Sequence, residues 1–102
     1  MEYKYEYKIN YSKRAMTNLV SIVKYIADDN RKAALKFYKE ITNKILEVLG
    51  TNPYVCDFPP EEALRYKGKR RMIFGNYKIF YSIDENQKWV KIATIRHSAR
   101  KP

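Results

Sequence analysis

The chain has 102 residues, 31% of them charged and 45% hydrophobic, which suits one globular domain with a single modest core. Its formal net charge is +10 and its isoelectric point is about 9.7, a balance typical of proteins that contact polyanions or acidic proteins, although basic charge also serves solubility. One cysteine excludes an internal disulfide, one cysteine with one histidine excludes the usual four-ligand zinc site, and no apolar run approaches the ~20 residues of a membrane span. We therefore expect a single domain over residues 1–102, in the cytoplasm, with no protein-only zinc site and no membrane partner.

The residues that follow Met1 alternate between aromatic or aliphatic and polar side chains over the string EYKYEYKINY. Successive side chains of a strand point to opposite faces, so this alternation predicts a half-buried strand over residues 2–11. Its buried face would carry Tyr3, Tyr5, Tyr7, Ile9 and Tyr11.

Two amphipathic helices are predicted next, because apolar residues recur at spacings of three and four. Ser12 is the expected N-cap of a helix over residues 13–27, and Asn30 is the expected N-cap of a helix over residues 31–49. Gly50 would end the second helix as its C′ residue. The connection between the helices is short, so they should form an antiparallel hairpin.

Residues 51–64 contain three of the four prolines and predict an ordered loop that crosses from the helices to a sheet. Cys56 in this loop is expected to be a small buried side chain, because no neighbour in the sequence would activate a thiolate.

The rest of the chain predicts three consecutive antiparallel strands over residues 69–74, 77–83 and 89–96. Gly75 and Asn76 form a hairpin signal, because both tolerate the positive φ that primed turns need. A longer polar turn joins the last two strands.

The order β-α-α-β-β-β predicts an α+β two-layer domain, with the helical hairpin packed on a largely antiparallel four-stranded sheet. Tyr77, Ile79, Tyr81 and Ile83 alternate with Lys78, Phe80 and Ser82, so one face of the middle strand is built for burial. The core is expected to contain Tyr5, Tyr7, Ile22, Ile26, Phe37, Ile41, Ile79, Tyr81 and Ile92.

Positive charge is concentrated in the predicted sheet. Residues 65–102 contain eleven Lys or Arg against two acidic residues, a net +9 of the total +10. Solubility alone does not require such clustering, so we expect a binding surface for a target or nucleic acid on the uncovered face and its rims, although a solvated strand end fits equally well. The candidates are Lys69, Arg70, Arg71, Lys78, Arg96 and Arg100, with His97 beside them.

The strings GNYKIFY at residues 75–81 and RHSAR at residues 96–100, in this order of elements, resemble the RelE/ParE superfamily of bacterial toxins. These are the toxins of type II toxin–antitoxin pairs, often called plasmid stabilisation proteins, and the resemblance covers nearly the whole chain. It implies the same fold, a cognate antitoxin as partner, growth inhibition as the effect, and no metal or cofactor.

The superfamily contains two activities. RelE-like members resemble compact nucleases that cut messenger RNA on the ribosome, whereas ParE-like members resemble inhibitors of DNA gyrase. Lys69 and Arg71 fall near the basic pair of the cutting branch, but Lys78 stands where an arginine is usual and loses its planar fork. No tyrosine follows Tyr81, although RelE-like enzymes often place one near the C-terminus. Together with the long helices, these departures favour the ParE-like branch.

If the chain is an enzyme, it is expected to be an mRNA endoribonuclease. Such cleavage needs a base, an acid and a stabiliser of phosphorane charge. His97 would be the proton carrier, Lys78 and Arg71 the charge stabilisers, and Glu61 or Glu62 a further base. A strand-end histidine bonded to a backbone carbonyl is the simpler interpretation of His97. A third hypothesis is a degenerate member that only binds its antitoxin or nucleic acid.

Overall fold

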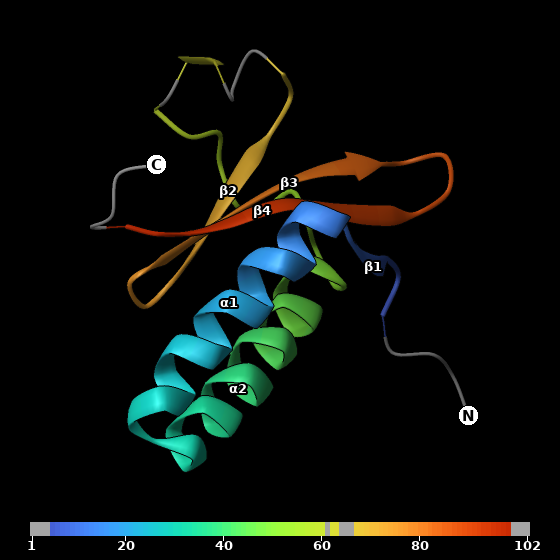
Figure 1. Cartoon of the computed structure of the whole chain (residues 1–102). Helices are drawn as coiled ribbons and strands as arrows, with labels where there is room; N and C mark the ends of the chain where they lie inside the picture. Colours follow the sequence, from blue (N-terminus) through green and yellow to red (C-terminus); the bar gives the residue numbers. More distant parts are fainter. Residues whose placement is uncertain (1–4, 61, 64–66, 99–102) are drawn as a thin grey trace.

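The computed structural model describes residues 5–60, 62–63 and 67–98, and every structural statement below concerns these residues. The predicted order of elements is confirmed, and a helical hairpin lies against one side of a sheet (Figure 1). The elements are β1 (Lys8–Tyr11), α1 (Lys13–Asp29), α2 (Arg31–Leu49), β2 (Arg70–Phe74), β3 (Tyr77–Asp84) and β4 (Trp89–His97).

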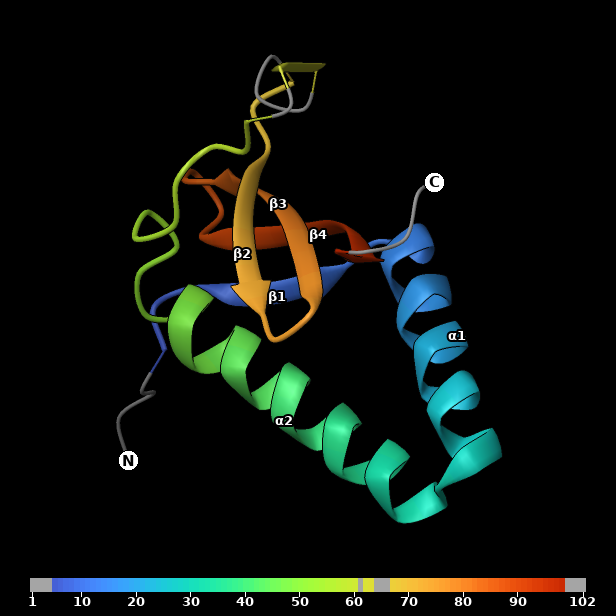
Figure 2. The same ribbon diagram turned by 90° about the vertical axis from the view of Figure 1, so that its left-hand side faces the viewer.

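The four strands form one sheet in the order β1-β4-β3-β2, with β2 as the outer strand that lies nearest the viewer in Figure 2. β2, β3 and β4 pair antiparallel as predicted, and β1 pairs parallel with β4. Gly75 has a positive φ of 56° in the β2–β3 turn. Asn76 has no positive φ, and the hairpin predicted from Gly75 and Asn76 is confirmed by the pairing of Phe74 with Tyr77.

The first strand is shorter than predicted. It begins at Lys8, which pairs with Trp89, the first residue of β4. Before that point the Tyr7 N–H donates to the Gly50 carbonyl at 2.9 Å, outside the sheet. The alternating aromatic residues therefore begin before the strand does, because β4 starts at Trp89 and has no residue to pair with those before Lys8. Residues 2–4 of the predicted strand lie outside the described part of the chain.

Both helix N-caps are as predicted. The Ser12 hydroxyl accepts a hydrogen bond from the Ala15 N–H, and the Asn30 side chain accepts one from the Ala33 N–H, each at 3.0 Å. α2 has the predicted bounds, and α1 continues two residues past Ala27 to Asp29. These caps satisfy amide groups that the first turn of a helix leaves without partners.

Gly50 is the C-cap of α2 and not the predicted C′ residue, with a right-handed φ of −72°. Its N–H donates to the Leu46 carbonyl at 2.9 Å, and a β-carbon built on it would lie 2.4 Å from that oxygen and 3.2 Å from the Tyr5 ring. A glycine is required here by lack of space.

The core lies between the helices and the sheet. Of the predicted core residues, Tyr7, Ile41, Ile79, Tyr81 and Ile92 are buried. Four others are only partly buried, namely Tyr5, Ile22, Ile26 and Phe37. Figures 1 and 2 show why for the hairpin: its tip projects beyond the sheet, so the distal turns have no second layer to cover them. Among the described residues, no helix has the length and apolar character that crossing a membrane would require.

Phe80 departs from the prediction that only one face of the middle strand is buried. It lies on the face opposite the helices, as its alternation predicts, yet it is only 1% exposed. The Arg96 guanidinium lies over its ring at 5.5 Å. A bulge also interrupts the β3–β4 pairing here, because Phe80 pairs with Thr94 while the next residue, Tyr81, pairs with Ile92.

Candidate target-binding surface

Three of the predicted basic residues gather on the sheet face that the helices leave uncovered. Arg71 pairs with Phe80, Ile73 pairs with Lys78, and Lys78 pairs with Arg96. Directly opposed residues of neighbouring strands share a face, so these side chains point to the same side. We call Arg71, Lys78 and Arg96, with Ile73 and Phe80 between them, the basic face.

The basic face combines positive charge with apolar contact area. Phe80 is buried beneath the Arg96 guanidinium, whereas Ile73 is 53% exposed. The acidic residue on this side of β3 is Asp84 at the far end of the strand, where its carboxylate lies 4.0 Å from the Lys91 ammonium. Such a surface suits a phosphate backbone or an acidic protein segment.

Arg70 has a different role from its neighbour Arg71. It pairs with Tyr81 on the helix-side face, where its guanidinium donates to the Cys56 carbonyl at 2.7 Å. The same guanidinium lies over the Phe58 ring at 4.5 Å and over the Tyr54 ring at 5.3 Å. Arg70 therefore holds the loop that follows α2 against the sheet.

The Tyr81 hydroxyl strengthens this attachment by donating to the Pro53 carbonyl at 2.6 Å. Burial is the main reason that the pKa of Tyr81 is raised above 10. Cys56 is half-buried beside this site and packs against the core. The remaining basic candidates are Lys69, half-buried just before β2, and Arg100, which lies outside the described residues along with Glu61.

His97 is not brought together with Lys78 and Arg71. It pairs with Tyr77, and so it shares the helix-side face with Ile79 and Ile95. Its ring meets the Tyr77 ring edge-on, with centroids 5.1 Å apart and an interplanar angle of 89°.

A cavity of about 240 Å³ lies beside His97 and is lined by Asn18, Ser21, Ile22, Tyr25, Tyr77, Ile95 and His97. The Asn18 side-chain oxygen accepts hydrogen bonds from the Thr94 hydroxyl at 2.8 Å and from the Ile95 N–H at 3.1 Å. Beyond its pairing with β1, β4 therefore bonds to Asn18 of α1, and these hydrogen bonds hold the helix next to His97.

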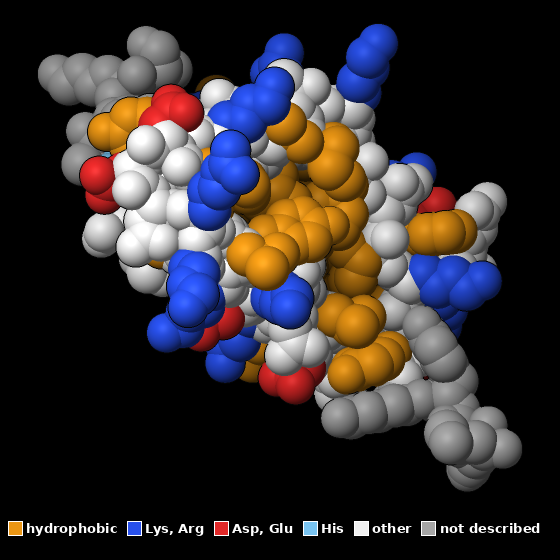
Figure 3. Space-filling view, turned by 60° about the horizontal axis from the view of Figure 1, so that its bottom comes forward, with side chains coloured by type: hydrophobic (Ala, Val, Ile, Leu, Met, Phe, Trp, Pro, Cys, Tyr) orange, Lys and Arg blue, Asp and Glu red, His pale blue; other side chains and the backbone are white. Residues whose placement is uncertain are grey.

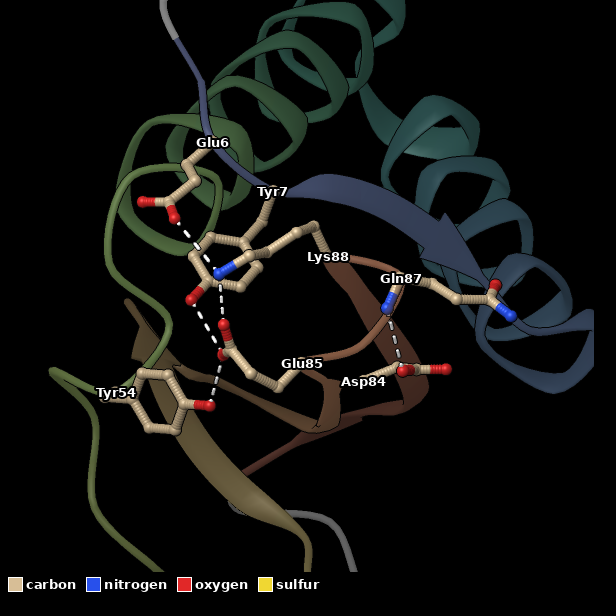
Figure 4. Close-up of polar contacts among 7 residues, drawn as sticks. All are labelled: Glu6, Tyr7, Tyr54, Asp84, Glu85, Gln87 and Lys88. Atoms are coloured by element: carbon tan, nitrogen blue, oxygen red, sulfur yellow. Dashed lines mark hydrogen bonds and ion pairs between the residues drawn. The ribbon is translucent and has the colours of Figure 1, made fainter.

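Sequence patterns did not reveal a polar cluster around Glu85, shown in Figure 4. One Glu85 oxygen accepts from the Tyr7 hydroxyl at 2.9 Å and from the Tyr54 hydroxyl at 2.6 Å, while the Lys88 ammonium donates to the other. Lys88 also pairs with Glu6 at 3.1 Å. The cluster joins the N-terminal segment, the loop after α2 and the β3–β4 turn.

The electrostatics of this cluster follow from its hydrogen bonds. Bonds from Lys88, then Tyr54 and Tyr7, lower the pKa of Glu85 to about 2. The pKa of Lys88 is raised, first by its bond to Glu85 and then by Glu6. The pKa values of Tyr7 and Tyr54 are raised as well, by burial in the first case and by the Glu85 hydrogen bond in the second. The only sequence signal was the unusual density of tyrosine.

Residues 9–102 match the family model of the ParE toxin of the type II toxin–antitoxin system, parDE. The chain belongs to the ParE toxin family. The predicted RelE/ParE resemblance is thereby confirmed, while no curated protein sequence matches the chain.

Solved structures of similar fold agree with this family. A chain of the toxin–antitoxin complex RelBE2 from Mycobacterium tuberculosis superposes with a TM-score of 0.67 at 18% identity, covering 98% of this chain and 100% of that one. The chromosomal ParDE system from P. aeruginosa gives 0.71 at 17% identity, covering 90% and 96%. The archaeal RelE–RelB complex from Pyrococcus horikoshii OT3 gives 0.50 at 20% identity, covering 94% and 99%. The fold class of this ParE-family toxin is therefore confirmed.

Proposed function

We propose that this ParE-family toxin inhibits growth by a ParE-like action on DNA gyrase and not by cutting messenger RNA. The observation that carries the proposal is the position of His97 on the helix-side face, away from Lys78 and Arg71. A general acid or base must come within hydrogen-bond reach of the atom it serves. The basic face therefore supplies positive charge for recognition without an imidazole to move protons.

Two further features of the chain support binding over RNA cleavage. Lys78 offers a single ammonium where an arginine would grip a phosphate with two parallel hydrogen bonds. Residues 82–102 contain no tyrosine that could serve as a proton donor.

One preparation of purified toxin tests the proposal in two assays. We expect gyrase supercoiling to fall when toxin is added, ribosome-bound message to remain intact, and His97→Ala to leave toxicity largely unchanged. Message cleavage that disappears in the His97→Ala protein, with supercoiling unaffected, would overturn it. Loss of a general acid or base typically costs 10²–10⁴-fold in rate, so that alternative has a large signature.

The alternative function is RelE-like cleavage of messenger RNA on the ribosome. It is favoured by the cross-strand pairing of Lys78 with Arg96, which sets two cations side by side as a phosphate would require. A protein without either activity would be a degenerate member that binds its antitoxin or nucleic acid alone.

We further propose that a cognate antitoxin neutralises the toxin, partly through the helical hairpin. Figure 3 shows exposed hydrophobic side chains gathered on one side of the molecule, with Lys and Arg beside them. Met16 and Val20 of α1 line a hollow with Lys24. On α2, exposed Leu35 lines another with Lys32, Lys36, Lys39 and Glu40. An acidic amphipathic helix would match this combination of apolar and basic groups.

A further inference from the structure

We propose that the cavity beside His97 binds a small planar aromatic ring that carries a carboxylate. The cavity lies between α1 and the sheet, where Tyr77 of β3 pairs with His97 of β4. It is separate from the basic face, because Lys78 and Arg96 point to the opposite side of the sheet. Such a ligand would bind whether or not the toxin acts on gyrase or pairs with an antitoxin.

The size of the cavity limits the part of a ligand that it can enclose. Its volume is about 240 Å³. An apolar cavity of about 150 Å³ holds one benzene molecule, and sites for drug-sized ligands begin at about 300 Å³. A single ring with a small substituent therefore fits, whereas the sugar and phosphate of a nucleotide would extend out of the cavity.

The walls of the cavity suit a flat ring. The Tyr77 and His97 rings stand edge-on to one another, with centroids 5.1 Å apart. A planar ligand can stack on one of them and meet the other edge-to-face, and aromatic pairs prefer both arrangements. Tyr77 also packs against the Phe37 ring at 5.1 Å, and the buried side chain of Ile95 adds an aliphatic wall. The apolar part of the site is therefore in place before a ligand binds.

Asn18 supplies a hydrogen-bond donor whose orientation is fixed. Its side-chain oxygen accepts from the Thr94 hydroxyl and from the Ile95 N–H, so the oxygen and the NH₂ group of the amide can be told apart. Among the described residues, none accepts a hydrogen bond from this NH₂ group. The group is not buried, because every buried polar side-chain atom of the described residues has a partner. It is therefore available to donate to a ligand in the cavity that Asn18 lines.

Ser21 is the second donor, and the charge of the lining indicates what the donors would bind. Ser21 follows Asn18 by three residues on α1 and lines the same cavity, and its hydroxyl has no hydrogen bond to the described residues. The described residues of the lining include no aspartate or glutamate, and the whole chain has a net charge of +10. Hydrogen bonds to an ionised acceptor are about twice as strong as neutral ones. A carboxylate on the ring is therefore the substituent that matches this site best.

Benzoate is the probe, with benzyl alcohol as its neutral counterpart and cyclohexanecarboxylate as its non-planar one. Binding to purified toxin is followed by NMR through the methyl signals of Ile22 and Ile95, which line the cavity. We expect saturable benzoate binding that shifts both signals and raises the melting temperature, because a ligand of the folded state stabilises it. Benzyl alcohol should bind about tenfold more weakly and cyclohexanecarboxylate about threefold more weakly.

Two substitutions test the donors. Asn18→Asp keeps an oxygen that accepts from β4 but replaces the NH₂ group by a negatively charged oxygen, whereas Ser21→Ala removes only a hydroxyl at an exposed helical position. We expect each variant to weaken benzoate binding about tenfold. Thr17→Ala is the matched control, because Thr17 is also exposed on α1 but lines a different hollow, and this variant should bind benzoate as the parent does.

Four results would overturn this assignment. Absence of saturable benzoate binding, or binding that leaves the Ile22 and Ile95 signals unchanged, would reject the cavity as the site. Unchanged affinity of Ser21→Ala would reject the donors, and it decides the matter even if Asn18→Asp does not fold. Equal binding of benzyl alcohol and benzoate would reject the carboxylate. Tighter binding of guanosine or uridine, weakened by the same substitutions, would assign the cavity to a nucleobase instead.

Discussion

At the scale of single residues, Glu85 is the side chain whose replacement is most informative about stability. Its folded-state pKa of about 2 lies below the ordinary 4.5. A lowered carboxyl pKa contributes stability that is present above pH 4.5 and is lost as the pH falls toward 2. We expect Glu85→Gln to unfold at lower denaturant concentration than the parent at pH 7, and to lose less stability on acidification through that window.

The measurement is a series of urea titrations from pH 7 to pH 2, with Glu47→Gln as control because Glu47 is exposed on α2. If parent and Glu85→Gln lost stability in parallel across the whole range, the hydrogen bonds from Tyr7, Tyr54 and Lys88 would have no energetic role.

Ile79 is the residue that tests the assignment of the sheet faces. Its side chain is fully buried in the core. Truncation of a buried isoleucine to alanine removes transfer free energy and leaves a cavity, so Ile79→Ala should cost about 2–5 kcal/mol in the free energy of unfolding. Ile73→Ala, on the neighbouring strand and facing solvent, is the control and should change stability by about 0.5 kcal/mol or less. Equal losses at the two positions would contradict the described faces.

At the scale of elements, local signals predicted the helices well. Ser12 and Asn30 are N-caps whose effect is confined to the next three residues, so the sequence alone contains the information. The first strand was overextended because its length depends on where β4 begins, at Trp89, far away in the chain. The sequence predicts that Gly50 ends α2 as a C′ residue, the commonest role of a glycine after a helix. The structure instead requires a glycine there because a β-carbon would lie 2.4 Å from the Leu46 carbonyl oxygen.

The face of His97 could not be predicted, because it depends on the bulge in β4. Strict alternation from buried Ile92 would direct Arg96 toward the helices and His97 away from them. The β3–β4 register instead shifts by one residue at Ala93, so that Ile95 and His97 face the helices and Arg96 faces outward. Bulges re-aim side chains in this way and have weak sequence signals. The basic candidates therefore stay predictions as binding residues, and their division between the two faces could not be read from the sequence.

At the scale of the whole molecule, the distribution of charge predicts how fast the antitoxin associates. Replacing Lys69, Arg71 and Lys78 by glutamate should slow association at low salt, because clustered surface charge steers encounter. Arg70 is kept, since it holds the loop after α2. Stopped-flow association at two salt concentrations makes the measurement.

Lys91→Glu is the matched control for charge steering, because Lys91 is exposed at the other end of the face beside Asp84. An association rate of the triple variant that equals the parent's at low salt would show that the basic face is not the surface that steers encounter.

The parallel pairing of β1 with β4 also sets the order in which the toxin can be completed during its synthesis. β1 leaves the ribosome before both helices and before β2 and β3, whereas its ladder partner, which begins at Trp89, follows all of them. The Ser12 hydroxyl and Asn18, both near the start of α1, likewise bond to Ala93, Thr94 and Ile95. Contacts of such long sequence separation form late and slowly. A nascent chain therefore exposes its helical hairpin before its basic face exists, and an antitoxin that binds the hairpin as proposed would meet that surface first.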